Sequence, residues 1–164
     1  MLARRRCYRK AARSKTLRMR SSSHNVLITG GSRGIGLALA QVFHANGNRV
    51  VLIGRDSAAL ADAAATMPGA ESLAVDLALP GAAEEIVRSF PDVSVLVNNA
   101  GIQINGAFES IPAEKVVREI AINLTAPLAL THAYLPAASI GGRADHAPGV
   151  VGRFGIEHNA AHWT

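Results

Sequence analysis

The stretch "NVLITGGSRGIGLALAQVF" (25–43) sets Gly30, Gly34 and Gly36 between a short apolar run and a longer segment of helical period. The apolar run 25–29 predicts a buried strand, and 34–46 predicts a helix that ends at an Asn-Gly pair. A helix that starts directly after a strand presents free backbone N–H groups and the positive end of its dipole. Because glycines let a phosphate approach that backbone closely, we expect a phosphate group at this turn.

The alternation of strand and helix continues along the chain. We expect further strands at 49–54, 71–77 and 92–101 and helices at 57–66, with Ser57 as its N-cap, and at 80–90. Continuous apolar strands that alternate with helices indicate a parallel sheet with both faces covered. The sequence therefore predicts an α/β fold: a doubly wound parallel sheet of about four strands with helices on both faces.

A long apolar-rich segment, 112–138, predicts one long helix or two joined helices. Pro127 lies inside it, and proline removes the hydrogen bond to the carbonyl four residues earlier, that of Asn123. We therefore expect a kink and a free carbonyl at Asn123.

Three features together resemble the short-chain dehydrogenase/reductase family over residues 25–138: "TGGSRGIG" (29–36), "NNAG" (98–101) and Asn123. The resemblance implies an incomplete Rossmann-type domain that binds NAD(P). In that family the glycine turn holds the dinucleotide pyrophosphate, the NNAG segment lies beside the adenosine, and an Asn in the following helix supports a proton relay.

Carried over to this sequence, the resemblance implies a specific set of binding residues. They are Gly30, Ser32, Arg33, Ile35 and Gly36 at the phosphates, Asn98, Ala100 and Gly101 over the adenosine, Asp76 at the adenine amino group, and Asn123 for the relay alone. For Asp76 the alternative is a solvated acid at the end of a strand.

The end of the second strand, "LIGRD" (52–56), bears on the choice between NADP and NAD. An acid there accepts the ribose 2′-OH of NAD, whereas a 2′-phosphate calls for arginine. Gly54 occupies the expected acidic position and Arg55 follows it, while Arg33 lies in the glycine turn. We expect NADP, with NAD as the alternative because a small shift in the alignment would bring Asp56 into the acidic position.

The catalytic residues that the resemblance implies are missing. The family uses a Tyr with a Lys four residues later, and a Ser, to protonate the substrate oxygen. The tyrosines of this chain are Tyr8 and Tyr134 and its lysines are Lys10, Lys15 and Lys115, so no such pair exists. The chain departs from the family pattern near Ser139, for which a truncation, a frameshift or a gene-model error is the expected explanation. We expect cofactor binding without turnover, and a small carbonyl or alcohol substrate only for a full-length family enzyme.

The termini differ in composition from residues 25–138. Nine of the 17 Lys and Arg residues lie among the first twenty, where there is no acid, so the net charge of +5 belongs to a basic extension, 1–24. A disordered or spurious extension, a mitochondrial transit peptide and a nucleic-acid arm are the alternatives, although aromatic residues are too few to favour base stacking. A non-catalytic binding protein that uses this arm or the half-domain is the alternative function.

Residues 139–164 form an irregular, divergent tail in which we expect no strand. His158 and His162 are spaced for a metal, but no third ligand can be placed, so no metal site is predicted. Without a fifth strand the fourth would be an exposed edge that favours self-association. No apolar run is long enough to span a membrane, so we expect a cytoplasmic protein, or a mitochondrial one if the basic extension is a transit peptide.

Overall fold

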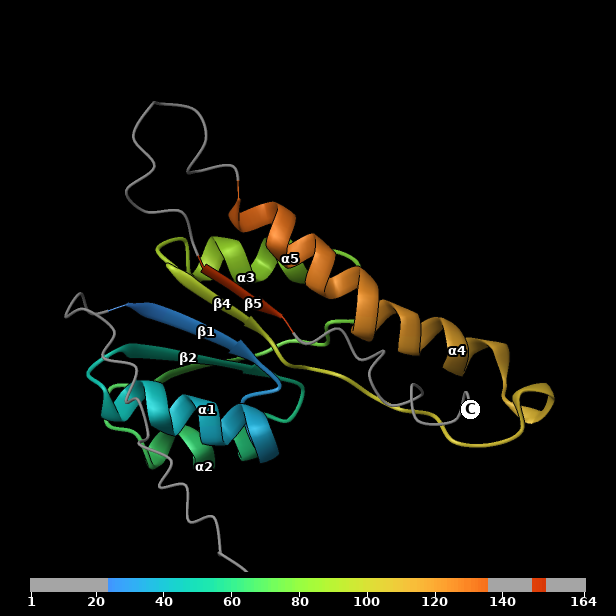
Figure 1. The fold of residues 1–164 in the computed structure, drawn as a ribbon, viewed down its shortest axis with the longest axis horizontal. Helices are drawn as coiled ribbons and strands as arrows, with labels where there is room; N and C mark the ends of the chain where they lie inside the picture. Colours follow the sequence, from blue (N-terminus) through green and yellow to red (C-terminus); the bar gives the residue numbers. More distant parts are fainter. Residues whose placement is uncertain (1–23, 136–148, 153–164) are drawn as a thin grey trace, which may run out of the picture.

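The protein, described here from a computed structural model, folds around a five-stranded parallel sheet of order β3-β2-β1-β4-β5 (Figure 1). The structure describes residues 24–135 and the backbone of 149–152. The strands are β1 (Asn25–Thr29), β2 (Arg49–Gly54), β3 (Glu71–Ala74), β4 (Val95–Asn98) and β5 (Gly149–Gly152). The helices are α1 (Gly34–Ala45), α2 (Ser57–Ala65), α3 (Ala82–Ser89), α4 (Ala113–Ile120) and α5 (Ala126–Tyr134), with a 3-10 turn η1 (Phe108–Ser110) and a π-helical turn η2 (Ala121–Thr125).

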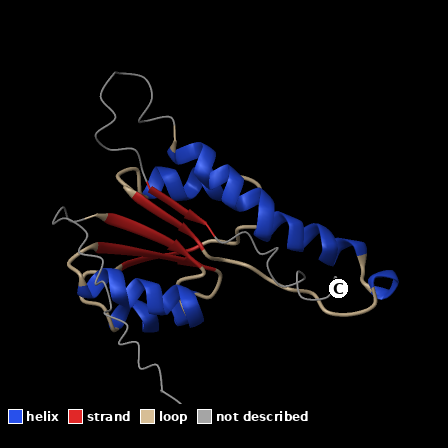
Figure 2. Ribbon diagram, viewed as in Figure 1, coloured by secondary structure: helices blue, strands red, loops and turns tan. Residues whose placement is uncertain are grey.

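The central strand β1 explains why both faces of the sheet are covered. Val26, Leu27 and Ile28 are fully buried, and successive side chains of a strand point to opposite faces. Val26 and Ile28 pack in the cluster that includes α1 and α2, whereas Leu27 packs in the cluster that includes α3 and α5. Helices accordingly lie on both sides of the sheet (Figure 2), and the predicted α/β doubly wound fold is confirmed.

The strand β5 corrects two predictions. We expected no strand after residue 139, but Gly149–Gly152 pairs in parallel with all four residues of β4. The sequence pattern predicted no strand because the apolar run Val150-Val151 is only two residues long. The segment becomes a strand because the edge of β4 supplies backbone hydrogen-bond partners. Since β4 is paired with β1 on one side and β5 on the other, the expectation that β4 is an exposed edge is wrong.

The N-cap of α2 differs from the prediction by one residue. Ser57 is the first helical residue, and Asp56 is the cap. The Ala59 amide donates to Asp56 Oδ1 over 3.1 Å, which satisfies one of the unpaired N–H groups of the first turn. Both Asp and Ser are good N-cap residues, so residue type alone does not decide which of the two caps α2.

The segment before Pro127 forms a continuous helical rod in which the winding changes (Figure 1). Where we predicted a kink and a free carbonyl at Asn123, the chain forms the π-helical turn η2, which lies between α4 and α5. Pro127 is the second residue of α5 and is buried. Such π-helical turns occur mostly as single turns inside α-helices, and proline, which has no N–H to donate, interrupts the normal hydrogen-bond ladder at this place. None of the helices that the structure describes is long and apolar enough to cross a membrane.

Tyr134, at the end of α5, belongs to the core. Its side chain is buried among the residues that α3 and α5 enclose, and its hydroxyl donates to the carbonyl of Phe90 over 3.0 Å. Phe90 precedes β4, so this contact lies toward the amino ends of the strands. Burial raises the pKa of Tyr134 to about 12, the opposite of what a catalytic tyrosine needs.

This burial predicts a stability loss at high pH. The folded-state pKa lies above the unfolded value of 10.0, so the contribution of Tyr134 is fully present below about pH 10 and is lost as the pH rises toward 12. Across that window the free energy of unfolding should fall by about 1.4 kcal/mol per pH unit more in the wild type than in Tyr134→Phe. Urea denaturation of both proteins at several pH values would measure this, and parallel pH dependences would contradict it.

Candidate functional site

A cleft of about 600 Å³ lies at the carboxyl ends of β1, β2 and β4. In open parallel sheets this edge is where ligands bind. The structure brings seven of the eleven predicted site residues into its lining: Gly30, Ser32, Arg33, Arg55, Asp76, Ala100 and Gly101. The expected binding residues of the glycine turn, the β2 end, the β3 loop and the β4 loop therefore face one space.

The glycine turn is packed too tightly for any side chain at two positions. Gly30 has φ +66°, and a Cβ there would lie 3.0 Å from Ala100 Cα. A Cβ at Gly36 would lie 2.2 Å from the Gly30 carbonyl oxygen and 2.5 Å from Asn99 Nδ2. These contacts bring α1 close against the turn, and a ligand in the cleft can approach the backbone itself.

Two polar residues that we did not predict hold this turn against β4. The buried hydroxyl of Thr29 accepts from the amides of Asn99 and Ala100, both at 3.0 Å, and donates to the Val97 carbonyl. Asn99 Nδ2 donates to the carbonyls of Thr29 at 2.9 Å and Gly30 at 3.3 Å. Thr29 and Asn99 stand inside the two quoted motifs, but the sequence does not show that the motifs bond to each other.

The electrostatics of the turn favour an anion. The amino end of α1 faces the cleft, and its first turn contains no acid that would neutralise the helix dipole. Arg33 is the N-cap residue, and its side chain makes no capping bond. Within the described residues neither Arg33 nor Arg55 forms a salt bridge, so both guanidinium groups are available to a negatively charged ligand.

The end of β2 lines the cleft without an acid in the expected position. Gly54 ends the strand, and Arg55 and Asp56 follow it into the lining. Asp56 also lines the cleft, but one of its carboxylate oxygens caps α2. A Cβ at Gly54 would meet only Leu60, at 3.5 Å or more, so the position has room for a side chain.

Asp76 is held by two donors. Arg118 Nη2 lies 2.7 Å from Asp76 Oδ2, and the Ala78 amide donates to Oδ1 over 3.0 Å. Burial alone would raise the pKa of Asp76, but the hydrogen bonds from Arg118 and Ala78 and the charges of Arg118 and Arg55 outweigh it and lower the pKa below its ordinary value. The carboxylate is therefore ionised at neutral pH.

Four predicted residues lie outside the lining. Ile35 is 58% exposed on α1, and Gly36 packs behind the turn. Asn98 is buried in β4, where its Nδ2 donates to Thr131 Oγ1 over 3.2 Å. Both polar atoms of the Asn123 side chain are bonded to the backbone of Ile102, with Oδ1 accepting at 2.9 Å and Nδ2 donating at 2.8 Å. The Asn123 amide thus fixes the loop after β4. The candidate metal ligands His158 and His162 lie outside the described residues.

The close packing of Gly36 generates a test. Gly36→Ala should open the turn, because the added methyl overlaps a backbone carbonyl, and it should lower the free energy of unfolding by roughly 1–3 kcal/mol. Gly34→Ala is the matched control: Gly34 has φ +58° but open space around it, so only the left-handed backbone conformation opposes the substitution, at about 1 kcal/mol. Equal denaturation midpoints for the two variants would contradict the packing argument.

Comparison with known proteins agrees with this geometry. The family model described as short chain dehydrogenase matches residues 24–158. Dehydrogenase/reductase SDR family member 7B of Bos taurus is 42% identical over 137 residues, which cover 74% of this chain and 42% of that protein. An uncharacterized oxidoreductase, DltE, of Bacillus subtilis is 38% identical over 124 residues, covering 72% and 49%. The chain thus spans less than half the length of these relatives.

Solved structures show the same likeness. A short-chain dehydrogenase from Sphingobium yanoikuyae in complex with NADPH superposes with a TM-score of 0.71 at 33% identity, over 79% of this chain and 52% of that one. A Pseudomonas aeruginosa RhlG/NADP active-site complex gives a TM-score of 0.70 at 28% identity, over 80% and 54%. The family model matches most of this chain, and the glycine turn packs against β4. This chain belongs to the short-chain dehydrogenase family.

Proposed function

We propose that this chain binds NADPH in the cleft. The pyrophosphate lies at the amino end of α1, the adenosine lies between Asp76 and the loop at Ala100 and Gly101, and the 2′-phosphate lies between Arg33 and Arg55. The observation that carries the proposal is that these two arginines face the cleft without a salt-bridge partner in the described chain, beside a strand end that lacks an acid.

The residues present fit such a cofactor. The tight approach of Gly30 and Gly36 leaves backbone rather than side chains where the pyrophosphate would lie. Two exposed guanidinium groups can neutralise a 2′-phosphate through charge-assisted, bidentate hydrogen bonds. Two of the similar solved structures are complexes with NADPH or NADP, which supports the same cofactor here. When bound, the cofactor supplies a hydride donor.

For the 164-residue chain itself we propose binding without turnover. A carbonyl that accepts a hydride needs a proton at its oxygen, and the chain contains no Tyr and Lys four residues apart. Tyr134 cannot take this role, because it is buried with its hydroxyl bonded to Phe90 and its pKa is raised to about 12. The Asn123 side chain is engaged at Ile102, so any relay through this residue would use its backbone carbonyl.

The first test is cofactor selectivity. NADPH should bind more tightly than NADH, with an advantage on the order of 1–3 kcal/mol from contacts to the 2′-phosphate. Gly54→Asp should reverse this preference, because an acid at the end of β2 repels the 2′-phosphate and accepts the 2′-OH of NADH. Fluorescence titration of the reduced nicotinamide measures both affinities.

A matched control separates charge from bulk at the end of β2. Gly54→Ala adds a methyl into a space with only ordinary contacts to Leu60, so it should keep the preference of the wild type. Equal affinities for the two cofactors in the wild type, or tighter binding of NADH, would overturn the assignment of Arg33 and Arg55.

The second test is turnover. The purified chain should oxidise no NADPH above the enzyme-free rate with a panel of ketones and aldehydes, because loss of a positioned general acid alone costs roughly 10²–10⁴ in rate. The absorbance of the reduced nicotinamide reports the reaction. Turnover that persists through purification would overturn the proposal of binding without turnover, and its loss in Tyr134→Phe would show that Tyr134 supplies the acid.

A further inference from the structure

The helix α4 is attached to both walls of the cleft. Arg118 of α4 reaches Asp76 in the loop after β3, at 2.7 Å. Asn123, in the turn that continues α4, clamps Ile102 in the loop after β4 with two hydrogen bonds. Asp76 and Ile102 both line the cleft, although Arg118 and Asn123 do not. A single helical rod therefore positions a residue on each side of the space where the proposed adenosine lies.

The bonds to Asp76 leave it able to accept more hydrogen bonds. An ionised carboxylate has about four lone-pair sites on its two oxygens. Arg118 occupies one site on Oδ2 and the Ala78 amide occupies one on Oδ1, which leaves one on each oxygen. With one donor on each oxygen, the plane of the carboxylate is fixed while it still faces the cleft.

Packing alone does not explain why Arg118 lies there. No residue of α4 is buried, so the helix is not held by a hydrophobic face that would dictate where its polar side chains lie. The side chains of Arg118 and Asp76 are 35% and 26% exposed, and a partly exposed pair of this kind contributes little to folding stability. The ordering of Asp76 is the clearest consequence of the contact.

We infer that Arg118 is a positioning residue for adenine recognition: by orienting the Asp76 carboxylate, it sets the preference of the cleft for a base with an exocyclic amino group. This inference rests on the proposed binding of NADPH. An amino group can donate to a remaining lone pair of Asp76, whereas purine with a hydrogen at the same position offers no such donor. Arg118 itself need not touch the base.

The test compares NADPH with its purine analogue, in which a hydrogen replaces the 6-amino group of the base and the ring nitrogens are unchanged. The wild type should bind NADPH on the order of ten-fold more tightly than the analogue. Arg118→Met should reduce this ratio to near one while the protein stays folded by circular dichroism, and Arg118→Lys, which keeps the charge without the planar fork, should retain part of it. General damage to the cleft would weaken both ligands alike and leave the ratio unchanged.

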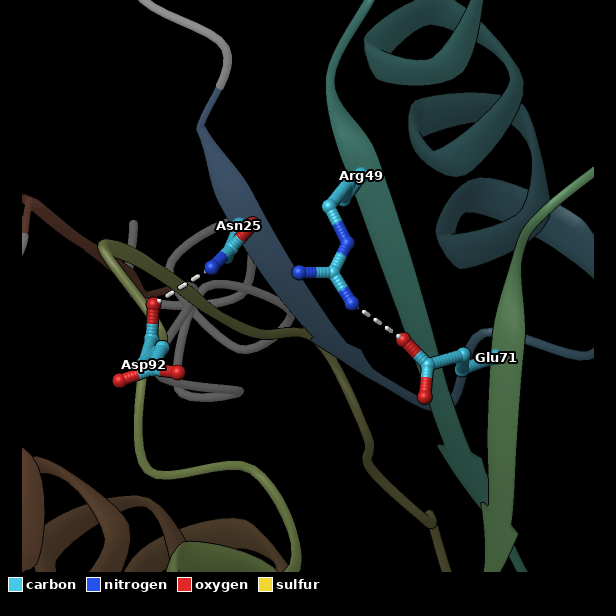
Figure 3. Close-up of polar contacts among 4 residues, drawn as sticks. All are labelled: Asn25, Arg49, Glu71 and Asp92. Atoms are coloured by element: carbon cyan, nitrogen blue, oxygen red, sulfur yellow. Dashed lines mark hydrogen bonds and ion pairs between the residues drawn. The ribbon is translucent and has the colours of Figure 1, made fainter.

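The chain offers a matched control at the other end of the sheet (Figure 3). Arg49 and Glu71 form the second salt bridge, at 2.9 Å, with Arg49 at the start of β2 and the cleft at its end. Arg49→Met removes the same kind of pair and should leave the ratio at its wild-type value. An Arg118→Met protein whose ratio is unchanged, or larger than that of the wild type, would overturn the inference. Failure of the wild type to bind NADPH would instead overturn the proposed function.

Discussion

The contact on which the rest of the site depends is the bond between the Thr29 hydroxyl and the loop after β4. This hydroxyl accepts from the amides of Asn99 and Ala100 and donates to the Val97 carbonyl, so its hydrogen-bonding capacity is fully used. It joins the glycine turn after β1 to the neighbouring strand at the edge where the cleft opens. Asn99 adds a second connection through its side-chain amide. Because the Thr29 hydroxyl is buried, breaking one of its bonds would leave a buried polar group unpaired.

Different groups line the cleft on the two sides of this connection. The turn, α1 and the end of β2 present backbone amides, a helix dipole and two exposed arginines, which suit phosphate groups. The loops after β3 and β4 line the same cleft with Asp76, Ala100 and Gly101. In the proposed binding mode the first part acts on phosphates through charge, and the second acts on the base through hydrogen bonds.

The helix α4 and the turn that follows it are connected to these loops, although most of the helix lies away from the sheet (Figure 1). It carries no buried side chain, and its connections to the cleft are polar: Arg118 to Asp76, and Asn123 in the next turn to Ile102. The π-helical turn η2, which contains Asn123, lies just before Pro127. An interruption that proline imposes on the helix is thus placed where a side chain fixes a cleft loop.

The sequence by itself determined the features that local patterns encode. Strand and helix alternation predicted the sheet, the glycine spacing predicted the tight turn before α1, and the "LIGRD" segment predicted Arg55 at the strand end that lines the cleft. Only the tertiary structure decided which residues bond across the fold. Thr29 and Ala100 are 71 residues apart, Arg118 and Asp76 are 42 apart, and Asn123 and Ile102 are 21 apart. The fifth strand likewise exists because β4 supplies its backbone partners. Such contacts leave no periodic trace in a single sequence, since they depend on where separate elements meet in space.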